Sequence, residues 1–225
     1  MQLYKMEPDG TSQNVVVDFG KKNALISDEL IYGENDDFAN SYVPLIGKSQ
    51  ISNFHEVYSQ ADFLYGVISV PIFSEKAKSV LDSFECFSFY EIIIDGVRGF
   101  YLCKIESEEE IIDAELSKYI LLTDGRETLS SPAYKKPSNT FLITRDIKHR
   151  SHYLVSDSFL SICRENRLKI KFKKIDVGKS NSFFDWLDIQ WLNNKDRHYY
   201  KDHMLIQLET FFGLYRDRQA VKPSE

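Results

Sequence analysis

The chain has 225 residues, 43% of them hydrophobic, and it contains 16 Phe and 13 Tyr. This aromatic content excludes a disordered chain, because disordered segments lack the apolar surface that offsets the conformational entropy of folding. The formal net charge of −6 disfavours strong non-specific binding to nucleic acid.

The first 60 residues contain two short predicted strands and then an irregular stretch. The strands cover residues 2–6 and 15–19, and a turn-forming sequence at residues 7–10 separates them. Residues 21–60 have poor periodicity and are interrupted by Gly33, Pro44 and Gly47. They are predicted to be mostly loop with short elements, a type of segment that often faces a partner.

The central region shows the clearest alternation of strand and helix. Residues 63–70 form an apolar, β-rich run, and Ser74 then precedes a helix-favouring stretch at residues 76–84. Serine at this point predicts a helix N-cap. Residues 89–94 and 97–105 are two further β-rich runs. Asp95 and Gly96 join them and predict a tight hairpin, because both residue types tolerate positive φ angles.

A second strand, Ser-capped helix and strand follow later in the chain. After an acidic tract at residues 106–110, residues 123–139 contain Gly, Pro and several Ser, which predicts a loop. Strands are predicted at residues 141–144 and 152–155, and Ser156 caps a short helix that ends at Asn166. Residues 168–175 then alternate apolar side chains with Lys, which predicts a strand with one buried face.

The predicted fold class is α+β, with a mixed or antiparallel sheet, two Ser-capped helices and a C-terminal helical extension. Residues 1–180 are predicted to form the α+β domain. Residues 181–225 contain two amphipathic, aromatic-rich helical patterns, and we expect them to pack on the same core.

The sequence shows no recognisable catalytic, metal or cofactor motif. The Gly-Lys-Ser triplets at residues 47–49 and 178–180 lack the earlier glycine of a phosphate-binding loop. The three cysteines are odd in number and widely spaced, which is typical of reduced, buried thiols. The five histidines lack cysteines at zinc-site spacing, although His198 and His203 with nearby acids leave a metal-dependent hydrolase as one alternative.

Charge is divided unevenly along the chain. Residues 1–120 hold 9 Lys and Arg against 21 Asp and Glu, a net charge of −12, whereas the remainder holds 19 against 13, a net charge of +6. An acidic surface favours basic partners, so we predict partner contacts at the acids Asp36, Asp37, Glu106, Glu108, Glu109 and Glu110. The Lys-rich stretch at residues 164–174 leaves nucleic-acid binding as another alternative.

Parts of the sequence resemble bacterial immunity proteins that are found beside polymorphic and contact-dependent toxins. The resemblance covers residues 60–176. It consists of VPIFSEKAKSVL at residues 70–81, FYEIIIDGVRGFYLCKI at 89–105, IDAELS at 112–117 and HYLVSDSFLSICRENRLKIKFKKI at 152–175.

This resemblance implies a cytoplasmic antitoxin that binds a cognate toxin domain and blocks it, without catalysis, cofactor or metal. A basic, nuclease-like toxin would match the acidic half of the chain. The N-terminus has no secretory pattern, and no apolar run is long enough to span a membrane. If the tract only contacts the partner, reversing Glu108, Glu109 and Glu110 to Lys should leave the melting temperature nearly unchanged.

Overall fold

The structure is a computed structural model that describes residues 1–9, 16–33, 44–50, 54, 61–121 and 127–178. All of these residues belong to one compact unit, Met1–Leu187. The predicted boundary at residues 180 and 181 and the predicted helical extension at 181–225 lie outside the described residues. Within the described part, strands and helices are mixed, so the α+β fold class is confirmed.

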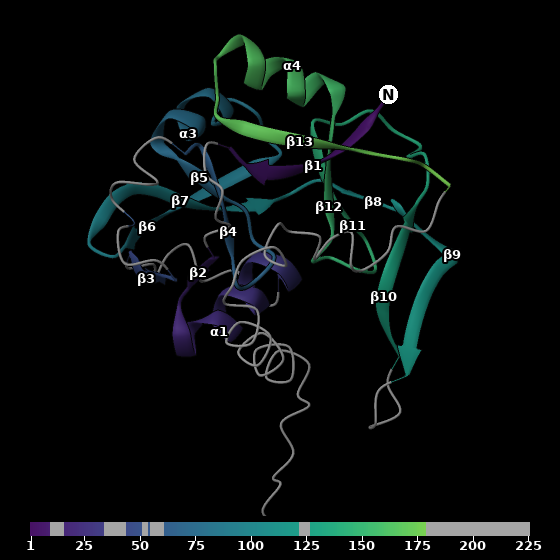
Figure 1. Cartoon of the computed structure of the whole chain (residues 1–225), viewed down its shortest axis with the longest axis horizontal. Helices are drawn as coiled ribbons and strands as arrows, with labels where there is room; N and C mark the ends of the chain where they lie inside the picture. Colours follow the sequence, from purple (N-terminus) through teal and green to yellow (C-terminus); the bar gives the residue numbers. More distant parts are fainter. Residues whose placement is uncertain (10–15, 34–43, 51–53, 55–60, 122–126, 179–225) are drawn as a thin grey trace, which may run out of the picture. The chain divides into compact units, whose positions relative to one another are not determined.

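Six strands form a closed barrel (Figure 1). The order around the barrel is β2-β3-β6-β7-β5-β4. Its core is apolar and includes Val17, Leu64, Ile92 and Leu102, all fully buried. The strand bounds are β2 Val16–Asp18, β3 Leu45–Ser49, β4 Phe63–Gly66, β5 Ile72–Ser74, β6 Phe87–Ile94 and β7 Val97–Ile105.

A five-stranded sheet has the strand order β13-β1-β12-β11-β8. It contacts the barrel where β1 packs on β4. All neighbouring strands in this sheet are antiparallel except β8 and β11, which are parallel. A separate two-stranded ribbon consists of β9 and β10. The bounds are β1 Leu3–Pro8, β8 Glu108–Glu109, β9 Ile112–Leu121, β10 Glu127–Tyr134, β11 Ile143–Asp146, β12 Tyr153–Ser156 and β13 Ile170–Ile175.

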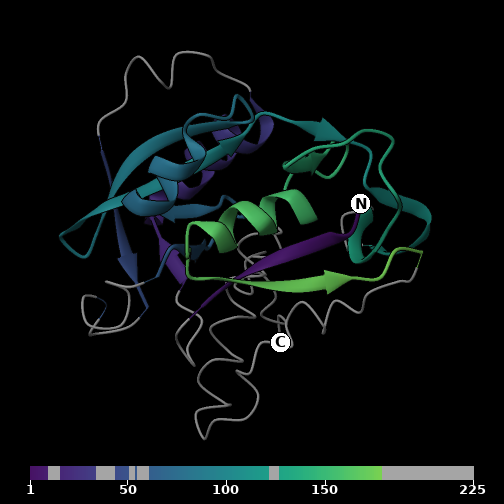
Figure 2. The same ribbon diagram turned by 90° about the horizontal axis from the view of Figure 1, so that it is seen from above.

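The described helices are short. A 3₁₀ turn η1 (Gly20–Lys22), helix α1 (Asn23–Ser27) and a π-helical turn η2 (Asp28–Tyr32) follow one another. Helices α3 (Glu75–Leu81) and α4 (Asp157–Glu165) have the predicted serine N-caps: the Ser74 hydroxyl accepts from the Ala77 amide, and the Ser156 hydroxyl accepts from the Phe159 amide. Figure 2 shows α4 lying along β1 and β13.

The strand–helix–strand pattern that occurs twice in the sequence has the same topology in both places. In the barrel, β5 and β6 flank β7 and both run antiparallel to it, with α3 as the connection. In the sheet, β12 and β13 flank β1 in the same way, with α4 as the connection. Both helices bury apolar side chains in one shared core, which contains Ala77, Leu81, Phe159 and Cys163.

Asp62 connects the two strand–helix–strand segments by hydrogen bonds. Its carboxylate accepts from the Ser74 hydroxyl at 2.6 Å and from the Lys169 amide at 2.7 Å. Asp62 is buried, so these bonds satisfy a charge that would otherwise be costly to remove from water. The cap of α3 is thereby tied to the residue that precedes β13.

The predicted hairpin is confirmed, and two other local predictions are corrected. Asp95 and Gly96 have φ angles of 48° and 82° between β6 and β7, as a tight turn of this type requires. The run predicted at 63–70 ends as a strand at Gly66, where an added Cβ would lie 2.9 Å from the Ile68 carbonyl oxygen. The chain bends there, and the Val70 amide donates back to that same oxygen.

The second correction concerns residues 123–139, which were predicted to be loop. Residues 127–134 form strand β10, which pairs with β9. Pro132 favoured the loop prediction because it cannot donate a ladder hydrogen bond. In the structure Pro132 lies within the second of two register shifts, the one between Ser131 and Ala133, where the ladder is interrupted.

Candidate partner-binding surface

The acidic tract lies on β8 and its flanks, but most of its carboxylates are engaged by side chains of the protein itself. Glu106 forms an ion pair with Lys104 at 3.3 Å and accepts from the Ser88 hydroxyl. Asp36 and Asp37, the other two acids predicted to contact a partner, lie outside the described residues. The carboxylates of the tract therefore differ in their surroundings.

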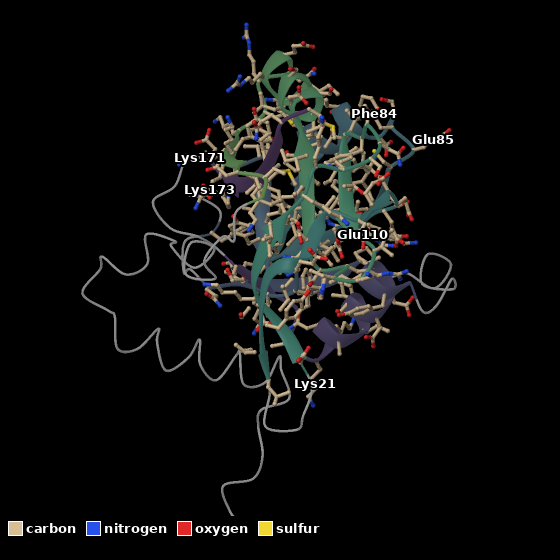
Figure 3. The ribbon with its side chains drawn as sticks, turned by 90° about the vertical axis from the view of Figure 1, so that its right-hand side faces the viewer. Lys21, Phe84, Glu85, Glu110, Lys171 and Lys173 are labelled. Atoms are coloured by element: carbon tan, nitrogen blue, oxygen red, sulfur yellow. The ribbon has the colours of Figure 1, made fainter. Side chains whose placement is uncertain are left out.

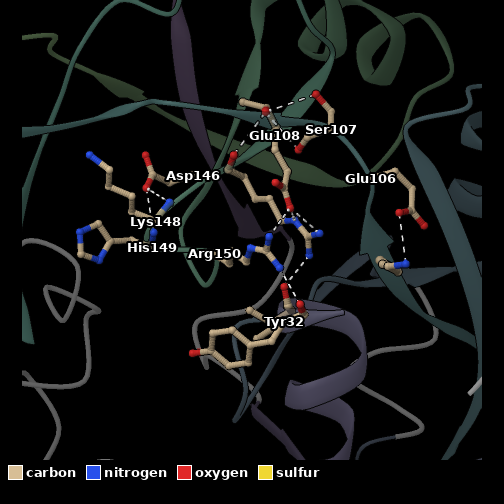
Figure 4. A network of polar contacts seen from close by, with 12 residues as sticks. Tyr32, Glu106, Ser107, Glu108, Asp146, Lys148, His149 and Arg150 are labelled. Carbon is tan, nitrogen blue, oxygen red and sulfur yellow. Dashed lines mark hydrogen bonds and ion pairs between the residues drawn. The ribbon is translucent and has the colours of Figure 1, made fainter. Parts of the chain in front are cut away.

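Glu108 belongs to a partly buried ion-pair network with two arginines (Figure 4). Its Oε1 lies 2.7 Å from Arg145 and 3.5 Å from Arg150. The Arg145 side chain is only 8% exposed, so its charge depends on Glu108 and on backbone carbonyls for compensation. The expectation that reversing the whole tract leaves stability unchanged therefore does not hold at Glu108.

The same two arginines cap the C-terminal end of η2. Arg145 donates to the carbonyl oxygens of Leu30 and Ile31 at 3.0 and 2.7 Å, and Arg150 donates to that of Tyr32 at 2.5 Å. The last carbonyls of a helix lack internal partners and carry partial negative charge, so cations stabilise them. Gly33 then ends the turn in the left-handed conformation. This contact fixes η2 against the sheet.

The turn between β11 and β12 is fixed by Asp146, which is buried. One carboxylate oxygen accepts from the amides of Ile111 and Ile112, and the other accepts from those of Lys148 and His149. Four backbone amides satisfy the charge, so this Asp is structural. It holds the turn at residues 147–150 beside the start of β9.

Glu109 and Glu110 lie beside the turn between β11 and β12, where Glu109 is half-buried and Glu110 is exposed. Glu109 accepts from the Asn139 side chain, and Glu110 forms ion pairs with Lys135 at 2.6 Å and Lys148 at 3.3 Å. Hydrogen bonds from Lys135 and then Lys148 hold the pKa of Glu110 below its usual value. Exposed pairs of this kind exchange readily with water and with a partner's charges.

Two large apolar side chains are exposed on the segments that the arginines hold together. Tyr32 is 46% exposed at the end of η2, and Ile147 is 48% exposed in the β11–β12 turn. Arg150 links these segments, and the backbone carbonyl oxygen of Glu109 accepts from the Ile147 amide. We call this region the Tyr32–Ile147 surface, and it comprises Tyr32, Ile147, Arg150, Lys148, Glu109 and Glu110.

The Tyr32–Ile147 surface has the composition of a protein interface. Tyr and Arg are enriched among residues that dominate binding energy, and charged residues commonly form the rim around apolar anchors. The segments that carry these anchors are held by a partly buried ion-pair network, so little ordering of the backbone is needed on binding. Sequence reasoning missed Tyr32, Ile147 and both arginines, since no local pattern links Glu108 to a residue 37 positions away.

The described residues contain little that suggests catalysis or a metal. No group of three or more His, Cys, Asp or Glu side chains suited to a metal occurs in the described ranges. His149 and His152 are in edge-to-face ring contact, whereas His55, His198 and His203 lie outside the described residues. Burial raises the pKa of the Cys103 thiol, and it raises the pKa of the Cys163 thiol to about 12. Both shifts disfavour a reactive thiolate.

The two remaining sequence features also have structural explanations. Gly47 to Ser49 belong to strand β3, so this triplet does not form a phosphate-binding loop. The Lys-rich stretch includes β13, the edge strand of the sheet, on which Lys171 pairs with Asp9. Lysines on an edge strand discourage pairing with other chains.

Comparison with protein family models and with curated proteins finds no match. In the part of the chain that the structure describes, no helix has the length and apolar character needed to cross a membrane.

Proposed function

We propose that this chain is an immunity protein, which binds and neutralises a secreted bacterial toxin domain in the cytoplasm by protein–protein contact. The observation that supports this most directly is the Tyr32–Ile147 surface, where two exposed apolar side chains stand on segments that a partly buried ion-pair network holds together. An inhibitor needs a surface of this kind, one that is already ordered before its partner arrives.

Charges around the apolar pair are of both signs, and this bears on the choice of toxin. Lys148 pairs with Glu110 and Arg150 pairs with Glu108, so the surface presents charges of both signs instead of one acidic patch. Such a rim selects a partner by matched pairs and steers its approach. A basic nuclease-like toxin remains the proposed partner, with Glu109 and Glu110 as the acids that it would meet.

The test begins with the neighbouring gene, which we expect to encode a large secreted protein whose C-terminal part is the toxin domain. We expect the purified pair to bind by calorimetry, and we expect co-expression to protect cells from the toxin. Ile147→Asp should weaken binding at least tenfold, because burying an unpaired charge at an interface centre is costly. Ile46→Asp is the matched control, since Ile46 is 66% exposed on β3, outside this surface.

The possible outcomes separate the function from its surface. Binding and protection that survive Ile147→Asp and Tyr32→Ala would support the immunity function but remove this surface from it. If the toxin domain neither binds the chain nor loses toxicity in its presence, the proposed function is wrong.

A further inference from the structure

The ribbon of β9 and β10 carries a concentration of exposed apolar side chains. Leu116, Ile120 and Leu121, all on β9, are 48%, 52% and 70% exposed. Figure 1 shows β9 on the outside of the ribbon, with β10 on its inner side. Single exposed apolar side chains are common on proteins, but three along one strand are typical of an interaction site.

The outer edge of β9 is open to a further strand. In the ranges that the structure describes, β9 pairs with β10 and with no other strand. The first part of β9 is partly closed by Asp113, whose carboxylate accepts from the amides of Glu115 and Leu116. This leaves residues 117–121 as the edge at which another strand can pair. An open edge of this kind is a template for pairing with a second chain.

Apolar side chains on both faces of β9 favour pairing at the edge over contact with one face. From Tyr119 to Leu121 the strand pairs with β10 residue by residue. Ile120 and Leu121 therefore point to opposite faces of the ribbon. A partner laid on one face would cover only one of them. A strand added beside β9 places a neighbour next to each, and its backbone bonds to the open edge.

The charge of the ribbon favours a basic partner over a second copy of this chain. The two strands hold three acids and one lysine, a net charge of −2, and these residues are Asp113, Glu115, Glu127 and Lys118. Two such ribbons brought edge to edge would repel each other, whereas a basic strand would be attracted.

The ribbon adjoins the Tyr32–Ile147 surface. The Tyr119 hydroxyl is 3.4 Å from Nε2 of His149, and the centroids of the two rings are 6.0 Å apart. His149 belongs to the β11–β12 turn, which is part of that surface. In Figure 3, which views the molecule from the side of the ribbon, Glu110 and Lys173 lie on opposite flanks. Glu110 pairs with Lys148 of the turn, so its flank is the one that carries the surface. One partner can therefore contact the turn and the ribbon together.

We propose that the toxin domain adds a strand to the outer edge of β9 at residues 117–121, which makes the two-stranded ribbon a three-stranded sheet. This inference rests on the proposed function, and it extends the toxin contact from the Tyr32–Ile147 surface to the ribbon. The strand that fits has apolar side chains beside Ile120 and Leu121 and a net positive charge. A third strand also stabilises the ribbon, because two-stranded ribbons are marginally stable by themselves.

The test is amide hydrogen exchange of the full chain, free and bound to the toxin domain, read residue by residue by NMR. On binding, every second amide within residues 117–121 should slow about tenfold or more relative to its neighbours, because alternate amides of an edge strand point outward. Contact with one face of the ribbon would not produce this alternation.

A substitution at the edge gives a second measurement. Ile120→Lys should weaken toxin binding about tenfold, because lysine on an edge strand discourages pairing and repels a basic partner. Ile46→Lys is the matched control, since Ile46 is similarly exposed but lies on β3 of the barrel, and it should leave the affinity unchanged.

The outcomes distinguish this inference from the proposed function. Toxin binding without slower exchange at residues 117–121 would overturn the strand addition and leave the proposed function in place. A toxin domain that does not bind at all would overturn both. Slow exchange at these residues in the free chain, or a dimer in sedimentation, would show that the chain itself or a second copy occupies the edge, and it would also refute the proposal.

Discussion

Replacing Glu108 by Gln tests whether the acidic tract is part of the protein's own framework. The substitution removes the carboxylate that lies 2.7 Å from Arg145 and 3.5 Å from Arg150, and it leaves the guanidinium of Arg145 buried. Breaking a fully buried ion pair costs about 3–5 kcal/mol. Glu108 is 28% exposed and Arg145 keeps two carbonyl partners, so we expect about 2–3 kcal/mol here.

The assay is chemical unfolding followed by circular dichroism, supported by a melting curve. For a unit of this size the expected loss lowers the melting temperature by about 4–12 °C. Glu110→Gln is the control, because its carboxylate is exposed and its ion pairs are on the surface, and it should give no resolvable shift.

A double-mutant cycle with Arg145→Met isolates the interaction. The destabilisation of the double variant should fall short of the sum of the single effects by about 1–3 kcal/mol, because both single changes break the same pair. Our reasoning about the network would be refuted by additive effects, or by a Glu108→Gln midpoint that equals that of Glu110→Gln.

Two further predictions concern the caps and pH. Ser156→Ala should cost about 1–2 kcal/mol in urea unfolding, because the buried hydroxyl caps α4; Ser74→Ala should cost more, because Asp62 also loses a donor. The unfolded chain protonates His152 near pH 6.5, whereas in the folded state the pKa is about 3. The free energy of unfolding should therefore decrease as the pH is lowered from about 6.5 to about 3, by up to about 1.4 kcal/mol per pH unit. His152→Gln should flatten that slope in urea unfolding measured across this pH range. An unchanged slope would contradict the assignment of a neutral, buried imidazole to His152.

Short-range signals in the sequence predicted the parts of the fold that depend on neighbouring residues. The Asp95–Gly96 turn and the caps at Ser74 and Ser156 are formed within a few positions, so their patterns are legible without the fold. Strand β10 was not predicted because proline normally indicates that a segment is not a strand. Only the register of β10 against β9 shows that the ladder is interrupted at Pro132.

The candidate surface was less predictable, because it depends on contacts distant in sequence. Local sequence showed that Glu108 is acidic but not that Arg145 would meet it, and the contact between Arg150 and Tyr32 spans 118 positions. The exposure of Ile147 follows from the way in which Asp146 folds the adjoining turn. None of these contacts leaves a periodic pattern in the sequence from which it could be predicted.

The insertion of β1 between β12 and β13 has a consequence for the order of events during synthesis. Strand β1 is synthesised well before its two partners: Gln2 and Ile175, which are hydrogen bonded, are 173 positions apart. At about 5–20 residues per second, the nascent first strand waits roughly 9–35 seconds for them. During that interval its backbone is open to wrong pairing, so a chaperone that shields the emerging N-terminal segment would be expected to raise the yield of native protein.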